Sequence, residues 1–205
     1  AQRDGALAKL AQAQLPNGGF PWFAGGPASP YITLYLMGGM ARAAEFAVPV
    51  PREMVQRGWQ YLAREAKEEW LPKAVKDDCC WELLTYLNYV ASSYPDPSWT
   101  GDFLNAGDRR TILDFSFKHW RDHQPLLKLQ LAATLERMNR HADAVLVLAS
   151  VMDSAKTTRD EGTFWQPEDR AWLWYNDRIE THAWALRTLM EVAPADPRRD
   201  GLVQW

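Results

Sequence analysis

The sequence has few of the features that mark membrane, disulfide-rich or nucleic-acid-binding proteins. Its 205 residues include only two cysteines, and the positive and negative side chains nearly balance at a formal net charge of −3. No apolar run reaches the roughly 18 residues that a membrane-spanning helix needs. No excess of Lys and Arg is present to neutralise a phosphate backbone. We therefore expect no membrane span and no nucleic-acid partner.

The sequence also offers little that could hold a metal. Cys79 and Cys80 are adjacent, and successive Cα atoms lie about 3.8 Å apart, less than the roughly 4.4–6.8 Å that disulfides usually span. We do not expect them to bridge, and two ligands are too few for a tetrahedral zinc site. His119 and His123 lie four residues apart without a third ligand at a suitable spacing. The sequence predicts neither a metal site nor a cofactor.

Helical periodicity dominates what is present. Apolar residues recur at steps of three and four between stretches broken by Pro and Gly. No stretch alternates between polar and apolar residues as a strand does, so we predict an all-α fold built from helical hairpins. The length favours one large domain. The predicted helices cover residues 31–47, 52–70, 80–93, 108–121, 125–139, 142–156 and 178–193.

One pattern occurs twice. Residues 16–22, Pro-Asn-Gly-Gly-Phe-Pro-Trp, resemble residues 160–165, Asp-Glu-Gly-Thr-Phe-Trp, and each copy precedes an aromatic loop and a long helix. Gly supplies a positive φ in such a turn, and we expect the aromatic residue after it to pack under the next hairpin. Repeated helical units of this kind stack into solenoids or close into toroids.

The aromatic loops supply the candidate binding residues. Eleven tryptophans are a heavy load for this length, and rings beside carboxylates suit a glycan cleft, where two carboxyl groups flank the scissile bond. The same acids and amides also suit helix capping, and the rings suit packing between hairpins, which is the interpretation we favour. The candidates are Trp22 in the first loop and Trp165, Trp172, Trp174, Tyr175, Asn176, Asp177 and Glu180 in the second.

These loops carry a family resemblance. Residues 18–23 and 30–35, the run 175–194 and the final residues 202–205 resemble the helical domain of bacterial alpha-2-macroglobulin-like proteins. The resemblance implies an α/α toroid of the thioester-containing type, similar to the toroids of terpenoid cyclases and complement proteins. Family members are large extracytoplasmic proteins that trap attacking proteases. Their thioester forms within a Cys-x-Glu-Gln motif, and neither cysteine of this chain precedes such a Gln.

The resemblance leads to a set of expectations. Residues 1–205 would form a single all-α toroid domain, or a fragment of one, excised from a larger protein in the periplasm, on the envelope or in the medium. It would contain no catalytic residue. Its partners would be the other domains of that protein, and proteases would be the targets of the whole. One alternative is a carbohydrate-active toroid enzyme or sugar-binding module using residues 164–182, and another is a peptide-binding hairpin at residues 125–156.

Overall fold

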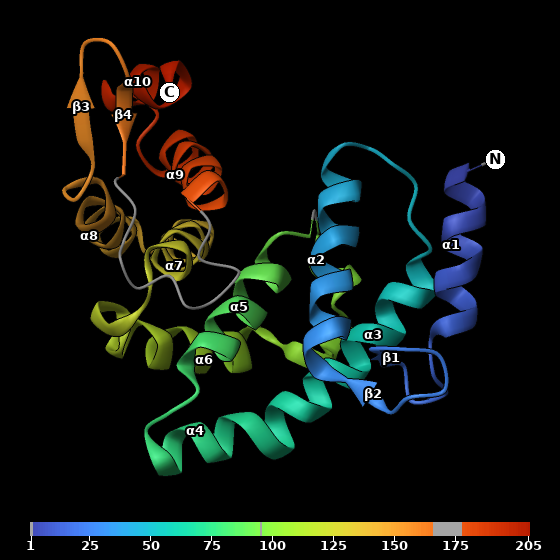
Figure 1. The fold of residues 1–205 in the computed structure, drawn as a ribbon. Coiled ribbons are helices and arrows are strands. Elements are labelled where there is room, and N and C mark those ends of the chain that lie inside the picture. Colours follow the sequence, from blue (N-terminus) through green and yellow to red (C-terminus); the bar gives the residue numbers. More distant parts are fainter. Residues whose placement is uncertain (1, 95, 166–177) are drawn as a thin grey trace. The chain divides into compact units, whose positions relative to one another are not determined.

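The computed structural model describes residues 2–94, 96–165 and 178–205 (Figure 1). Helices make up most of the described chain, which confirms the all-α fold class. The chain divides into two compact units, residues 1–112 and residues 113–205. Closure of the helical hairpins into a toroid stays a prediction.

The first unit has a core formed where α2 packs against α3 and α5. Its fully buried side chains are large and apolar, and they include Leu34, Met37, Trp59, Leu62, Leu84 and Leu87. Two 3₁₀ turns, η2 (Pro97–Trp99) and η3 (Gly101–Leu104), follow the last of its helices. The helices are α1 (Gln2–Ala13), α2 (Pro30–Glu45), α3 (Arg52–Glu65), α4 (Leu71–Asp77) and α5 (Trp81–Ser92).

A helix predicted to end near residue 70 continues to Asp77. A π-helical turn, η1 (Ala66–Trp70), joins α3 to α4 without leaving helical backbone angles. Pro72 is the second residue after this turn, and proline has no N–H to donate to the carbonyl one turn earlier. The proline therefore accompanies a widened turn instead of ending the helix. The chain leaves α4 at Asp78, whose φ of 49° is left-handed.

The second unit is built around the predicted αα-hairpin. In it α7 (Pro125–Arg137) and α8 (His141–Met152) pack against each other and against α9 (Arg178–Val192) (Figure 1). The hairpin turns at Asn139, which has a φ of 62°. Helix α6 (Ala106–Lys118) contains the boundary between the units, and the short η4 (Trp120–Asp122) follows it. The core includes Leu129, Leu135, Val147, Leu148, Ala185 and Leu189.

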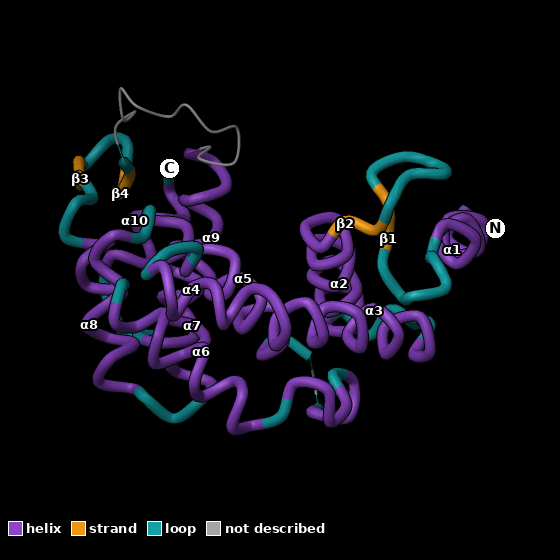
Figure 2. Tube along the Cα trace, turned by 90° about the horizontal axis from the view of Figure 1, so that it is seen from below, coloured by secondary structure: helices purple, strands orange, loops and turns teal. Residues whose placement is uncertain are grey.

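Two short β-hairpins accompany the helices of this all-α fold (Figure 2). In the first unit β1 (Phe20–Pro21) pairs antiparallel with β2 (Ala28–Ser29), and in the second β3 (Lys156–Thr158) pairs with β4 (Gly162–Phe164). The helix predicted over residues 142–156 therefore ends earlier, at Met152 in α8, and residue 156 begins β3. Strands of two or three residues are too short to show an alternating pattern.

Candidate functional site

The β1–β2 hairpin holds the first aromatic loop against the start of α2. The buried Thr33 hydroxyl accepts the N–H of Phe20 at 2.8 Å and donates to the carbonyl of Ser29 at 2.7 Å. The Ser29 side chain accepts the N–H of Ile32 at 3.3 Å and so caps α2, where Pro30 is the first helical residue. The loop between the two strands is thus fixed at both ends.

The loop directs its aromatic side chains outward. Phe20 is 1% exposed, whereas Trp22 is 63% exposed and Phe23 is 68% exposed. The Trp22 ring stacks on Tyr31 with centroids 5.9 Å apart and planes 13° apart. Tyr35 follows Tyr31 by one helical turn and is 59% exposed. We call Trp22, Phe23, Tyr31 and Tyr35 the aromatic surface, and covering it would remove apolar area from water.

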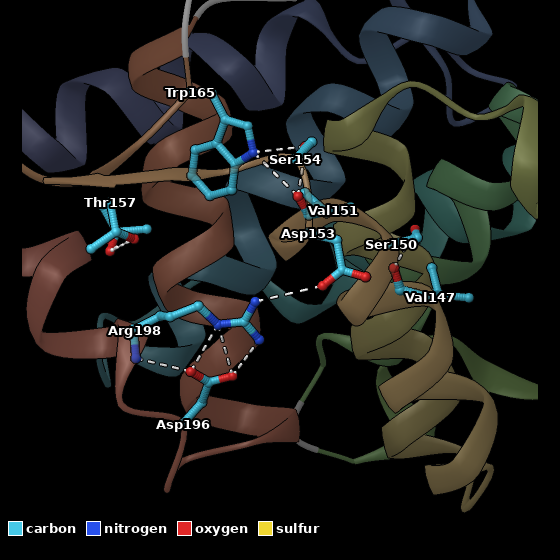
Figure 3. A network of polar contacts seen from close by, with 10 residues as sticks. Val147, Ser150, Val151, Asp153, Ser154, Thr157, Trp165, Asp196 and Arg198 are labelled. Carbon is cyan, nitrogen blue, oxygen red and sulfur yellow. Dashed lines mark hydrogen bonds and ion pairs between the residues drawn. The ribbon is translucent and has the colours of Figure 1, made fainter.

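The second aromatic loop begins by turning inward. The Trp165 indole N–H donates to the Val151 carbonyl at 3.2 Å and to the Ser154 hydroxyl at 3.0 Å (Figure 3). Its ring lies edge-on to buried His182 at 5.8 Å, and the His182 ring contacts Trp205 at 4.4 Å. Because Trp165 also packs on the core of the second unit, the structure favours a packing role for this residue.

Arg198, the first residue of α10 (Arg198–Gln204), contacts Asp153, the residue after α8 (Figure 3). Its guanidinium binds the Asp196 carboxylate through hydrogen bonds of 2.6–3.2 Å and lies 3.8 Å from the Asp153 carboxylate. Hydrogen bonding by Arg198 holds the pKa of Asp196 below its usual value. These contacts connect the residue after α8 with the start of α10.

The two glycine turns use the same packing. Gly18 has a φ of 89° and Gly162 a φ of 74°. A Cβ on Gly18 would overlap the carbonyl oxygen of Arg57 in α3, and one on Gly162 would overlap the carbonyl oxygen of Gly201 in α10. Each turn therefore packs its backbone directly on a helix later in the chain, α3 for Gly18 and α10 for Gly162, in a position that only glycine fits. The two copies of the sequence repeat therefore make the same kind of contact, a glycine backbone packed on a helix carbonyl.

The remaining predicted site residues divide into two groups. Glu180 is exposed in the first turn of α9. Trp172, Trp174, Tyr175, Asn176 and Asp177 lie outside the described residues. Sequence reasoning missed Phe23 and Tyr35, although one adjoins Trp22 and the other lies four residues after Tyr31.

The histidine pair lies in the interior of the second unit. His119 is 7% exposed and His123 is 3% exposed. Burial, followed by the nearby His119 and Lys128, lowers the pKa of His123 to about 4. Within the described residues no group of three or more His, Cys, Asp or Glu side chains could hold a metal ion. In the same part of the chain, every helix is too short or too polar to cross a membrane.

The fold has a counterpart among solved structures. The chain is similar to the crystal structure of native alpha-2-macroglobulin from Escherichia coli, which spans domain MG7 to the C-terminus. The match has a TM-score of 0.63 and 22% sequence identity, and it covers 97% of this chain. The two share a fold. The chain spans 29% of the length of that alpha-2-macroglobulin structure. No protein-family model and no curated protein matches the sequence.

Proposed function

We propose that this chain is a helical domain of a bacterial alpha-2-macroglobulin-like protease inhibitor, located outside the cytoplasm, and that it has no catalytic group of its own. The observation that carries the proposal is the fold shared with part of the Escherichia coli protein over 97% of this chain. The first glycine–aromatic turn adds support, because residues 18–23 are part of the family resemblance and Gly18 packs directly on α3 in the structure.

The proposed mechanism is conformational. A protease cleaves a bait segment elsewhere in the large protein, and the large protein then closes around the protease. The two helical units would serve as rigid walls, since each has its own apolar core. Inhibition of this kind is steric: a trapped protease keeps its active site but loses access to large substrates.

The aromatic surface is the proposed contact with another domain of the same protein. Trp and Tyr are enriched at protein interfaces, because they bury a large area at a small cost in side-chain entropy. Here a capped helix and a hydrogen-bonded hairpin hold the rings in place before any partner arrives. Pre-organisation of this kind lowers the entropic cost of association.

An immunoblot of fractionated source cells, with an antibody raised against this chain, tests the proposal first. We expect a band far above 23.5 kDa in the envelope or secreted fraction. A band near that mass in the cytoplasm would contradict the proposal.

A trapping assay on the full protein follows. Pre-incubation with an active protease is expected to block cleavage of a large protein substrate while a small chromogenic peptide is still cleaved. The same protease with its nucleophile chemically blocked is the control, because it cannot cut the bait and should leave the full protein unchanged. Equal inhibition of both substrates would argue for an active-site inhibitor instead.

A further inference from the structure

The two cysteines meet at the connection between α4 and α5. Their Sγ atoms are 2.7 Å apart and share a hydrogen bond, and both thiols are free. Cys80 is exposed and Cys79 is partly exposed. The chain contains no other cysteine, so every thiol in it belongs to this pair.

The backbone of the connection explains how adjacent side chains can meet. In an extended chain neighbouring side chains point to opposite faces. Here Asp78 and Cys80 both have left-handed backbones, with φ values of 49° and 62°. The Cys79 N–H donates to the Ala74 carbonyl at 3.3 Å, which ties the turn to the last residues of α4. The fold thus presents a pre-arranged pair of thiols to solvent.

We propose that Cys79 and Cys80 form a thiol–disulfide exchange site, which reacts with small-molecule disulfides and closes into a reversible vicinal disulfide. Sensor cysteines are typically accessible to solvent and have a second, resolving cysteine beside them. Cys80 matches the first requirement by its exposure, and Cys79 matches the second by the distance between the sulfurs.

The reaction proceeds in two exchanges. The Cys80 thiolate attacks one sulfur of the small disulfide; a protein–reagent S–S bond forms, the reagent's own S–S bond breaks, and one thiolate leaves. Cys79 then loses its proton to solvent and attacks the Cys80 sulfur, which expels the second thiolate. The protein loses two electrons and two protons, and the reagent disulfide is reduced to two thiols.

The surroundings set the order of the two sulfurs. The hydrogen bond with Cys80 is the main reason that the pKa of Cys79 is raised; Asp77 adds to this rise and Lys73 opposes it. Cys79 is also the less exposed of the two sulfurs, so it suits the second step. Adjacent Cα atoms are closer than disulfides usually allow, so the closed ring is strained and easily reduced. Both thiols are free in the structure, as the sequence leads us to expect, and the proposed bridge would form only on reaction with a disulfide.

Glutathione disulfide is a direct probe. The reduced 205-residue chain is incubated with it, free thiols are blocked with iodoacetamide, and the intact mass is measured. We expect the wild-type chain to lose two hydrogens, to take up no blocking group, and to recover both thiols with dithiothreitol. Cys79→Ser should stop at a stable adduct of one glutathione. Cys80→Ser should form its adduct more slowly than Cys79→Ser does, because Cys79 is only partly exposed.

Three results would overturn the proposal. The wild-type chain could keep a glutathione adduct as Cys79→Ser does, it could keep both thiols unreacted, or it could form a reducible dimer instead of an internal bridge. Circular dichroism of both variants checks that the helices are intact, so that a difference in adducts reports on sulfur chemistry.

Discussion

Gly18 shows at the scale of one residue how closely the first turn lies on α3. Its φ of 89° and the adjacent Arg57 carbonyl leave no room for a side chain. Gly25 provides a matched comparison, since its φ is 80° but nothing lies within 4 Å of the position that its Cβ would take. The two sites therefore separate the cost of a left-handed backbone from the cost of steric overlap.

We predict that Gly18→Ala lowers the free energy of unfolding by about 3 kcal/mol and Gly25→Ala by about 1 kcal/mol. Both variants place alanine at a positive φ, but only the first pushes a methyl group into a backbone carbonyl. Urea unfolding followed by tryptophan fluorescence measures both values. Equal losses would show that the turn moves away from α3 at little cost.

His123 makes stability depend on pH. Its pKa is about 4 in the folded chain and about 6.5 when unfolded. Between these values the unfolded chain binds more protons, so the free energy of unfolding falls as pH drops from about 6.5 to 4. A shift of this size corresponds to roughly 3 kcal/mol in total. Above pH 6.5 this contribution is fully present.

We therefore predict that His123→Gln flattens the acid side of the stability profile, whatever its effect at neutral pH. Gln124→Ala is the control, because the exposed Gln124 side chain next to His123 carries no titratable group, so this variant should leave the acid slope in place. Unfolding free energies measured between pH 4 and pH 7 decide the matter. An unchanged slope in His123→Gln would assign the acid sensitivity to other groups.

At the scale of elements, the β1–β2 hairpin depends on one hydroxyl. Thr33→Val keeps the shape of the side chain but leaves the buried N–H of Phe20 without its acceptor, so we predict a loss of about 1–3 kcal/mol. Thr33→Ser should retain most of the stability. Thr111→Val also removes a hydroxyl bonded to a helix carbonyl, but at an exposed site, and should cost less than about 0.5 kcal/mol. Similar losses in Thr33→Val and Thr111→Val would contradict this role.

The helices could be predicted because their periodicity extends over several turns. The predicted helix at residues 80–93 corresponds to α5 (Trp81–Ser92), and that at 125–139 to α7 (Pro125–Arg137). The short strands could not be predicted, because they depend on contacts distant in the sequence. Strand β4, for example, begins at Gly162, whose backbone packs on α10. Likewise, no local pattern indicates that Trp22 faces solvent while Trp165 packs inward, since each follows a similar turn.

The whole molecule gives these two tryptophans opposite roles. We predict that Trp22→Ala changes the unfolding free energy of this chain by less than about 0.5 kcal/mol, because its ring is mostly exposed. Trp165→Ala should cost about 2 kcal/mol through lost packing and lost hydrogen bonds.

In the full protein we expect the opposite ranking for protease trapping, with Trp22 mattering more than Trp165. Trp22→Ala should weaken protease trapping without unfolding the domain, whereas a mild Trp165→Phe replacement should leave trapping intact. Trapping assays on both full-length variants measure this difference. Normal trapping by Trp22→Ala would remove the aromatic surface from the proposed interface.

The packing of Gly18 and Gly162 on helix carbonyls also bears on how such a chain can diverge over evolution. Contacts between backbones do not depend on side-chain identity, so the contact of Gly18 with the Arg57 carbonyl places no demand on the Arg57 side chain itself. A turn held by such contacts can therefore keep its place on a helix while side chains on that helix change. The two glycines are instead the positions at which these turns tolerate least change, because any side chain there would meet a helix carbonyl.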